Sequence, residues 1–180
     1  MNLSKLALRD FVAPVCAVEP FRDPKQLLIQ LKGLSDRKFL QPIPEIYGRR
    51  GALLFDESEA YRALTLVTAL ELGILSDELR DVNRYLGSSP FDFANAASAL
   101  TDGLQIQIEF ARIRDLDDGR VLNSACWIVD GQYTNSLRSN PLSTESFSLG
   151  GPILGVTYLK FSELCRPLFD EFRRKEVAAV

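Results

Sequence analysis

Histidine is absent from this 180-residue chain, and cysteine occurs only three times. The lack of histidine removes the commonest general base, the commonest zinc ligand and every catalytic arrangement of the Ser-His-Asp or Cys-His type. Cys16, Cys126 and Cys165 are far apart and show no Cys-x-x-Cys spacing, so we expect buried, reduced thiols. The composition argues against an enzyme, and we predict no catalytic residue, no metal and no cofactor.

Long apolar runs are also missing. No stretch reaches the roughly 18 consecutive apolar residues that a membrane helix needs, and residues 1–10 mix polar and apolar side chains. We therefore expect a soluble, cytoplasmic protein with no membrane partner. Hydrophobic residues make up 46% of the chain and charged residues 25%, which is enough apolar material for the core of one domain or of two small ones.

Acidic residues are in slight excess over the whole chain, with a formal net charge of −3, but the charge is unevenly spread. Residues 20–50 hold seven basic and three acidic side chains, a local charge of +4, whereas residues 51–118 carry −8. A basic segment inside an acidic protein is typical of a phosphate-binding surface, because affinity for DNA depends on local contacts with phosphates. An ordinary solvated helix face is the alternative that charge alone leaves open.

Two helices are predicted at the start of the chain. Apolar residues recur at helical spacing over residues 2–12, which predicts a short amphipathic helix that stops near Pro14. Asp23 and Pro24, a capping residue followed by proline, then begin a second helix that extends to Leu40. The leucines of this helix form its inward stripe. Its polar face consists of Gln26, Gln30, Gly33 and Arg37, flanked by Lys25 and Lys32.

A Gln-Pro-Ile-Pro sequence ends the second helix. The residues after it predict two short strands around the Gly-Arg-Arg-Gly sequence at 48–51, with Arg49 and Arg50 at an exposed hairpin tip. Asp56 and Glu59 then have the capping-box spacing at the start of a helix that ends at Gly73.

The rest of the chain changes from helical to strand periodicity. A short helix over residues 76–86 and a domain boundary at residues 87–90 come first. Residues 105–115 and 121–129 alternate like the strands of a hairpin, with Trp127 in the core, and residues 153–161 predict a third strand. Residues 132–151 predict a long loop. A closing helix over residues 162–175 turns inward Leu164, Leu168, Phe169 and Phe172.

The order of these elements resembles that of the MerR-type winged helix-turn-helix regulators. The likeness is most specific in the run Gly48-Arg-Arg-Gly-Ala-Leu-Leu-Phe-Asp-Glu-Ser-Glu-Ala-Tyr-Arg-Ala-Leu-Thr-Leu-Val-Thr-Ala-Leu-Glu-Leu-Gly-Ile74. It implies that residues 23–40 form the recognition helix and residues 47–53 the wing. The family's long dimerising helix has no counterpart after Gly87, and no cysteine pair resembles a metal-sensing site, so no metal effector is implied.

We therefore predict an α+β protein with two domains. Residues 1–89 would form a winged helix-turn-helix, mostly helical with a two-stranded wing, and residues 90–180 a small antiparallel-sheet-plus-helix domain for dimerisation or for binding an effector or partner. The predicted function is sequence-specific binding of double-stranded DNA in transcription regulation, with the recognition helix in the major groove and the basic wing on the backbone or minor groove. The alternative is a protein-interaction adaptor that keeps the winged fold without binding DNA. The residues predicted to contact DNA are Lys25, Gln26, Gln30, Lys32, Arg37, Lys38, Tyr47, Arg49 and Arg50.

The predicted partners are double-stranded DNA, a second copy of the chain and RNA polymerase. A homodimer is expected because two modules on a twofold axis read two half-sites. The predicted contact uses the C-terminal hairpin and the closing helix, with Leu168, Phe169 and Phe172. Residues 1–89 are expected to fold alone as a monomer.

Overall fold

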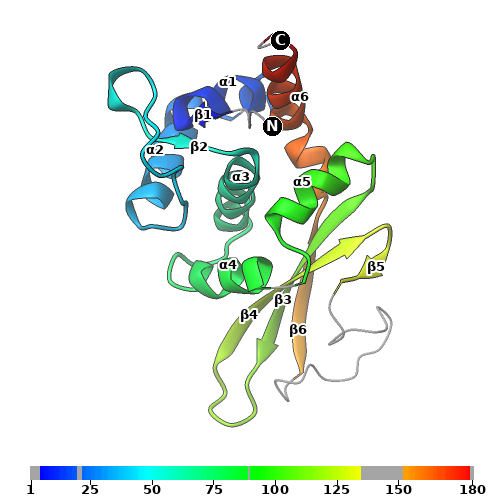
Figure 1. Cartoon of the computed structure of the whole chain (residues 1–180). Coiled ribbons are helices and arrows are strands. Elements are labelled where there is room, and N and C mark those ends of the chain that lie inside the picture. The colour runs from blue at the N-terminus through cyan, green and yellow to red at the C-terminus, as the bar shows by residue number, and fades with distance from the viewer. Residues whose placement is uncertain (1–4, 20–21, 89, 135–151, 179–180) are drawn as a thin grey trace. The chain divides into compact units, whose positions relative to one another are not determined.

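The computed structural model describes residues 5–19, 22–88, 90–134 and 152–178 (Figure 1). It contains helices and two antiparallel sheets, which confirms the predicted α+β class. The chain divides into two compact units. Unit 1 comprises Met1–Ala69 and Glu163–Val180, and unit 2 comprises Leu70–Ser162.

Unit 1 begins with a short strand and two helices. Strand β1 (Leu6–Ala7) pairs antiparallel with β2 (Leu54–Phe55), which ties the start of the chain to the segment that follows the basic loop. Helix α1 (Leu8–Val18) packs against helix α2 (Pro24–Asp36). A single 3-10 turn, η1 (Arg49–Gly51), precedes β2, and helix α3 (Glu57–Glu71) follows it.

Helix α1 corrects the prediction of a helix over residues 2–12. It begins at Leu8 because Ala7 pairs with β2 and donates its N–H to Asp10 Oδ2 at 3.1 Å. It also continues through Pro14, whose missing N–H deprives the Asp10 carbonyl of its usual helical donor. Phe11 and Val15 are buried and hold the helix in place across this break.

Both predicted carboxylate caps are present. Asp23 Oδ1 accepts a hydrogen bond from the N–H of Lys25, and Asp56 Oδ1 accepts one from the N–H of Glu59, each at 2.9 Å. The second half of the predicted capping box is not formed at Glu59, because its carboxylate accepts instead from the N–H of Gln41. Helix α3 thus begins as predicted, and Glu59 in its first turn forms a hydrogen bond with the loop that contains Gln41.

Helix α6 (Phe161–Ala178) supplies part of the core of unit 1. Phe172 of α6 and Tyr61 of α3 are both fully buried and meet edge to face. At the rim of this contact, Arg173 Nη2 donates to Glu57 Oε2 at 2.8 Å. The helix that closes the chain therefore belongs with its N-terminal residues.

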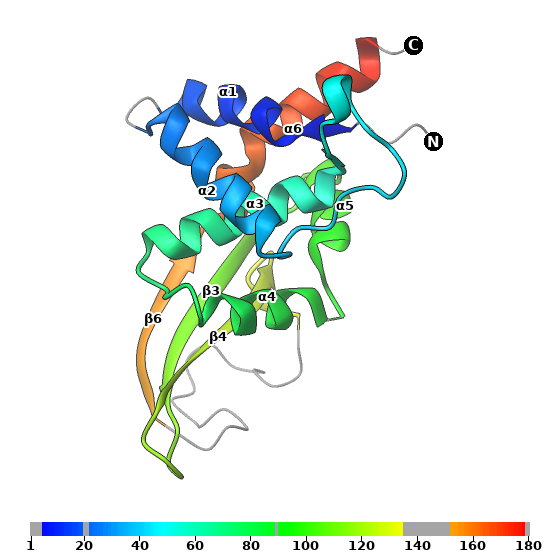
Figure 2. The same ribbon diagram turned by 90° about the vertical axis from the view of Figure 1, so that its left-hand side faces the viewer.

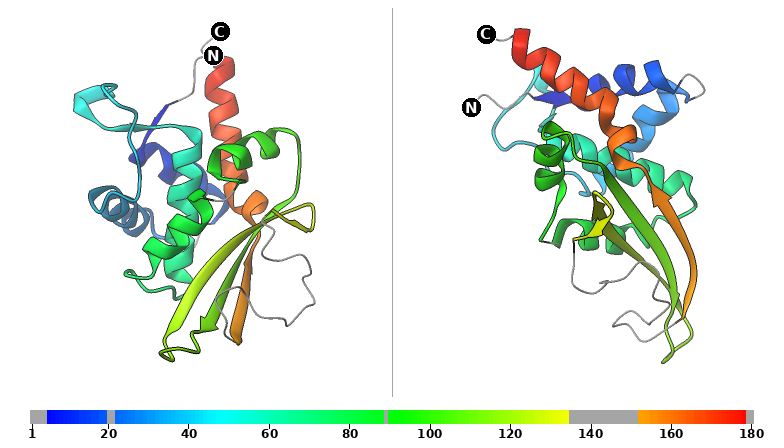
Figure 3. Two further views of the ribbon diagram at one scale, coloured as in Figure 1. Left: turned by 60° about the horizontal axis from the view of Figure 1, so that its bottom comes forward. Right: turned by 90° about the vertical axis from the view of Figure 1, so that its right-hand side faces the viewer.

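Unit 2 is built on a four-stranded antiparallel sheet in the order β5-β4-β3-β6. The strands are β3 (Ile106–Arg114), β4 (Val121–Val129), β5 (Gln132–Tyr133) and β6 (Ile153–Leu159), so the three predicted strands are confirmed. Helices α4 (Leu79–Ser88) and α5 (Phe93–Thr101) lie on one face of the sheet (Figure 3).

Trp127 of β4 occupies the centre of this packing, as predicted. Its fully buried ring meets Phe91, Phe93 and Phe161 edge to face, with centroids 5.0–5.5 Å apart. Its Nε1 donates to the carbonyl of Leu86 at 3.0 Å. The boundary predicted at residues 87–90 therefore falls inside unit 2, because α4 before it and α5 after it pack on the same sheet.

The structure of unit 2 differs from the sequence predictions in three further places. Helix α4 begins at Leu79 and not at residue 76. Helix α5 was not predicted, although Asp92 caps it by accepting from the N–H of Asn95 at 2.9 Å. Strand β5 lies in the predicted loop 132–151, of which residues 135–151 lie outside the described residues.

The cysteines are thiols, as predicted, with Cys126 and Cys165 buried and Cys16 half-buried. Among the described helices, none combines the length and the apolar character needed to cross a membrane.

Candidate functional site

Helix α2 presents one apolar and one solvent-facing side, and the predicted DNA-reading residues lie on its outer part. Leu27, Leu31 and Leu34 are buried and fix the helix to unit 1. Lys25 and Gln26 in its first turns and Lys32 in its middle are exposed, whereas Gln30 is half-buried. The cap at Asp23 and the proline at the first helical position define where this surface begins.

Arg37 is held against the end of its own helix. Its Nε donates to the carbonyl of Gly33 at 3.0 Å, and its guanidinium lies 5.5 Å from the ring centroid of Phe39. A cation at this position also compensates the negative end of the helix dipole. Arg37 thus closes α2 in addition to contributing charge to the surface.

The prediction that this helix extends to Leu40 was wrong, because α2 ends at Asp36. The backbone of Lys38 explains the earlier end. Its φ of 60° places it in the left-handed region, and its N–H donates to Ser35 O while that of Phe39 donates to Leu34 O. These two bonds form a Schellman motif, in which glycine is the usual residue at the position of Lys38. Phe39 is buried, so the chain turns sharply and leaves the exposed Lys38 side chain at the end of the helix.

The loop over residues 41–53 is a narrow hairpin with the two arginines at its tip. The N–H of Ile43 donates to Leu54 O at 2.8 Å, and that of Gly48 donates to Ala52 O at 2.7 Å. The predicted pair of strands is reduced to one bridge between Tyr47 and Leu53, because the next residues pair with β1 instead.

The tip of this hairpin is tightly constrained. Arg49 and Arg50 are both exposed, and Arg50 has a φ of 62°, an uncommon left-handed conformation for a side chain of this size. At Gly48 a Cβ atom would come within 2.9 Å of Leu54 Cδ2, so glycine permits the close approach of the two arms. The positions of the two arginines are therefore set by the backbone.

Glu59 anchors the start of the same loop. Its carboxylate is buried, accepts from the N–H of Gln41 at 2.9 Å and lies 3.1 Å from Arg62 Nε. Burial raises the pKa of the Glu59 carboxyl, while the Gln41 hydrogen bond and the Arg62 charge act in the opposite direction. The loop is thus connected to α3 at its beginning and to β1 through β2 at its end.

Helix α2 and loop 41–53 lie on the same side of unit 1, the side that faces the viewer in Figure 2. Six exposed cations lie on or between these two segments; Arg37 is one of them, and none of the other five forms an ion pair with any other described residue. The five are Lys25, Lys32, Lys38, Arg49 and Arg50. Exposed acids also occur here, at Asp23, Asp36 and Glu45.

Ile29 is a surface residue that the sequence analysis missed. It lies on the outer side of α2 and is 62% exposed. Helical periodicity could have predicted its exposure, because Ile29 does not lie on the buried face formed by Leu27, Leu31 and Leu34.

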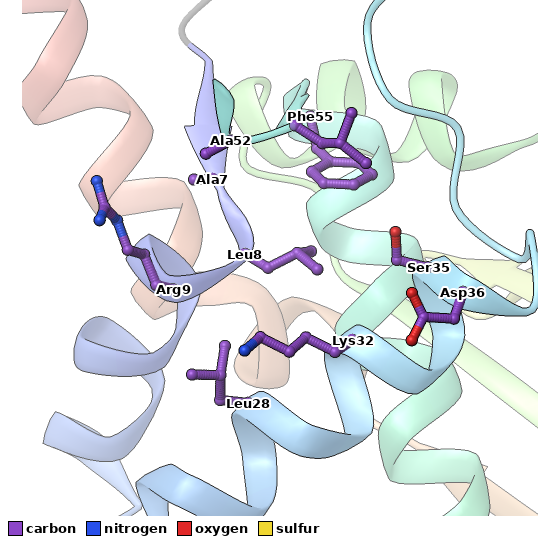
Figure 4. A pocket seen from close by; sticks show the side chains of 10 residues that line it. Ala7, Leu8, Arg9, Leu28, Lys32, Ser35, Asp36, Ala52 and Phe55 are labelled. Carbon is purple, nitrogen blue, oxygen red and sulfur yellow. The ribbon is translucent and has the colours of Figure 1, made fainter. Parts of the chain in front are cut away.

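An open groove of about 450 Å³ runs along the other flank of α2 (Figure 4). Leu8, Leu28 and the aliphatic part of Lys32 point into it, with Asp36 at one end and Arg9 at the other. Lys32 is therefore separated from Gln26 and Gln30, which lie on the opposite flank of the helix. The predicted site residues form two neighbouring strips and not one continuous row.

Comparisons with known proteins identify no relative of this chain. No protein-family model, curated protein or solved structure matches it. Its function must be inferred from its own residues.

Proposed function

We propose that this chain is a sequence-specific, double-stranded DNA-binding transcription regulator, in which α2 enters the major groove and loop 41–53 acts as a wing on the backbone or minor groove. The observation that carries the proposal is the position of α2 and of the two-arginine hairpin on one side of unit 1, with exposed cations on both segments and between them. Such a local basic surface supports binding despite the net negative charge, because salt screens the distant acids.

The order of elements in unit 1 supports a winged helix-turn-helix. Helix α1 packs on α2 after a short connection, a hairpin loop follows, and β2 returns to pair with β1 before α3 begins. In a helix-turn-helix the second helix reads the major groove with its N-terminal residues. The resemblance of residues 20–86 to MerR-type regulators agrees with this assignment.

Base reading is assigned to the first turns of α2. Gln26 is exposed and can form two hydrogen bonds with adenine, and Lys25 can donate to guanine. Ile29 adds an apolar surface one turn further on, which suits contact with the methyl group of thymine. Gln30 is half-buried, so its contribution depends on how closely the helix approaches the bases.

Phosphate contacts are assigned to the ends of this surface. Arg49 and Arg50 at the hairpin tip and Lys38 at the end of α2 are exposed cations on constrained backbone, so binding would order little additional chain. Lys32 and Tyr47 would contribute at the edges of the surface, and Arg37 through the N–H groups that its contact with Gly33 leaves available.

The phosphate contacts can be tested with the double variant Arg49→Ala, Arg50→Gly. Glycine suits the left-handed backbone at residue 50, so the variant should keep its fold. Fluorescence anisotropy with labelled duplexes at several salt concentrations should show weaker binding to all sequences, with a salt slope reduced by about one for each lost contact. A control for loss of positive charge is Arg174→Ala on α6, which removes one exposed cation of unit 1 that is not assigned to DNA. Unchanged affinity and slope in the double variant would contradict the proposal.

The base contacts need a separate measurement. After selection of a preferred duplex from a random pool, Gln26→Ala should cost about 1–3 kcal/mol on that duplex and much less on random DNA. Ile29→Ala should affect the preferred duplex in the same selective way. Equal losses on both duplexes would show that these side chains do not read bases.

A protein-interaction adaptor is the second candidate, and exposed apolar residues favour it. Ile29, Tyr47 and Leu53 are 62%, 65% and 44% exposed on the same two segments. Apolar side chains exposed on one side of a domain can form a protein-binding surface. Absence of any salt-dependent affinity for duplex DNA at low salt would favour the adaptor.

The proposal includes a homodimer, since two modules bind two half-sites more tightly than one. The interface predicted on the closing helix needs correction, because Leu168 and Phe172 are buried inside unit 1. A dimer would have to use other residues, and light scattering of the full chain at tens of micromolar tests for it. RNA polymerase as a partner remains a prediction.

A further inference from the structure

A small pocket opens on the sheet of unit 2, whereas the residues assigned to DNA belong to unit 1. Its volume is about 270 Å³, and it lies between strands β3, β4 and β6 and the turn that follows α3. Arg112, Asn123 and Thr157 supply its polar groups. Its apolar walls come from Leu72, Ile74, Phe110 and Leu154.

The polar groups are brought together by the register of the strands. Asn123 of β4 and Gly155 of β6 are the direct neighbours of Arg112 on the two sides of β3. Side chains at such paired positions point to the same face of a sheet. Arg112 Nη2 donates to the carbonyl of Gly73 at 3.1 Å, which holds the guanidinium beside the pocket while its other N–H groups can still donate.

Asn123 has a hydrogen-bonding group that the described chain does not satisfy. Its side chain is only 6% exposed, and its Nδ2 is buried without a hydrogen-bond partner among the described residues. Leaving a buried donor without an acceptor is costly and uncommon in folded proteins. Because Asn123 lines the pocket, an acceptor that enters the pocket would remove this cost.

Gly155 lines the pocket without contributing a side chain. It lies in the middle of β6, where glycine weakens a strand and often marks a close approach by a ligand. A Cβ atom at this position would meet no atom within 4 Å, so packing against the rest of the protein does not require glycine here. The β6 register also shifts beside it, between the partners of Arg112 and Ile113.

We propose that this pocket binds a small organic carboxylate with an apolar body. A guanidinium and a carboxamide N–H both donate, so they select a ligand group that only accepts, and the planar carboxylate matches the planar guanidinium. The walls of Leu72, Ile74 and Phe110 suit a short aliphatic chain or a single ring. The volume is below the range of about 300–1,000 Å³ that is usual for drug-sized ligands, which limits the ligand to a small molecule.

The direct test is a titration of the ¹⁵N-labelled full chain with hexanoate, benzoate and phenylacetate, followed by NMR. At least one of the three acids should shift the backbone signals of residues 72–74, 110–112 and 154–157 and, most diagnostically, the side-chain NH₂ signals of Asn123. Dissociation constants between about 10 μM and a few mM are expected for ligands of this size. Phenylacetamide and hexanamide, which lack the charge, should bind much more weakly.

Variants of the pocket separate a binding role from a structural one. Arg112→Gln should weaken carboxylate binding by about tenfold or more. The matched control is Arg114→Gln, since Arg114 is on the same strand but does not line the pocket. Asn123→Leu should also abolish binding while leaving thermal stability equal or higher, because it removes an unsatisfied buried donor.

Gly155→Val provides an independent variant that keeps all the polar groups. Valine favours strands and its Cβ atom would meet no atom within 4 Å, so the variant should be at least as stable as the parent chain but should lose carboxylate binding. The proposal is overturned if none of the acids shifts these signals at about 10 mM, if the amides bind as well as the acids, or if Arg112→Gln binds unchanged. These measurements involve no DNA, so their outcome does not depend on the function proposed for unit 1.

Discussion

Phe172 of α6 packs edge to face against Tyr61 of α3, with ring centroids 6.4 Å apart and planes at 74°. The two residues are separated by more than a hundred positions in the chain, and both are fully buried. The Tyr61 hydroxyl donates to Glu57, which also accepts from Arg173 beside Phe172. The core of unit 1 is therefore completed by the last helix of the protein.

This packing leads to a prediction about fragments. Residues 1–89 lack α6, so Tyr61 and the neighbouring side chains of α3 would be exposed to water. Loss of a buried aromatic side chain alone costs about 3–5 kcal/mol, a large part of the stability of a small domain. We expect the fragment to show no cooperative urea unfolding by circular dichroism, whereas the full chain does.

The structure therefore replaces the expectation that residues 1–89 fold alone. A cooperative unfolding transition in the fragment, with a urea midpoint close to that of the full chain, would show that residues 1–89 do fold alone. Full-length Phe172→Ala is a less severe version of the same test, and Val177→Ala is its control, because Val177 is 78% exposed on the same helix.

Local features of the fold were predictable from the sequence. The caps at Asp23 and Asp56 rest on bonds to residues two or three positions away, and strands β3 and β4 rest on alternation and a tight turn. Helix α5 could have been found in the same way, since Asp92 and Asn95 form a capping box.

The remaining errors came from contacts between distant residues. The pairing of Leu6 with Phe55 decides where α1 begins, and the contact of Tyr61 with Phe172 decides which residues form unit 1. Neither contact can be recognised from the sequence of the ten or twenty residues around it. The exposure of Ile29 followed from helical spacing, but the pocket around Asn123 required the register of three strands.

Lys38 allows stability and charge to be tested separately. Its left-handed backbone at the end of α2 favours glycine, so Lys38→Gly should raise the free energy of unfolding by about 0.5–1 kcal/mol. Lys38→Ala keeps the Cβ atom and should not be stabilising. Both variants remove the same charge, and equilibrium urea unfolding will distinguish them.

The same pair of variants tests the proposed DNA contact. If Lys38 contacts a phosphate, both should weaken binding to duplex DNA equally, although their stabilities differ. If the less stable variant binds DNA more weakly than the more stable one, the loss of affinity comes from the altered fold and not from a lost phosphate contact.

The three thiols should differ in reactivity. Cys16 is half-buried, and burial raises the pKa of its thiol, so at pH 7.5 it should react with a disulfide reagent more slowly than a free thiol of pKa about 8.5. Burial also raises the pKa of Cys165 strongly, so this residue should react only when the protein unfolds. Cys16→Ser should remove the faster phase, and three equal rates in the native protein would contradict the assignment.

Glu59 should make stability depend on pH. Burial raises the pKa of this carboxyl in the folded protein above its unfolded value of about 4.3. The folded state therefore favours the protonated form. The stabilisation is fully present below the unfolded pKa and is lost as the pH rises through the folded pKa.

Glu59→Gln should remove this dependence while keeping an oxygen that accepts from the N–H of Gln41. The difference in unfolding free energy between the parent chain and this variant should fall as the pH rises from 4 to 7, leaving the variant at least as stable at neutral pH. Glu163→Gln, at an exposed position of α6, is the control for the substitution itself. Glu59→Ala should instead lose about 1–3 kcal/mol at pH 7, because it leaves the Gln41 N–H without its acceptor. A difference that rises with pH would mean that the Gln41 bond and Arg62 outweigh burial, and that the charged form of Glu59 is the one the fold favours.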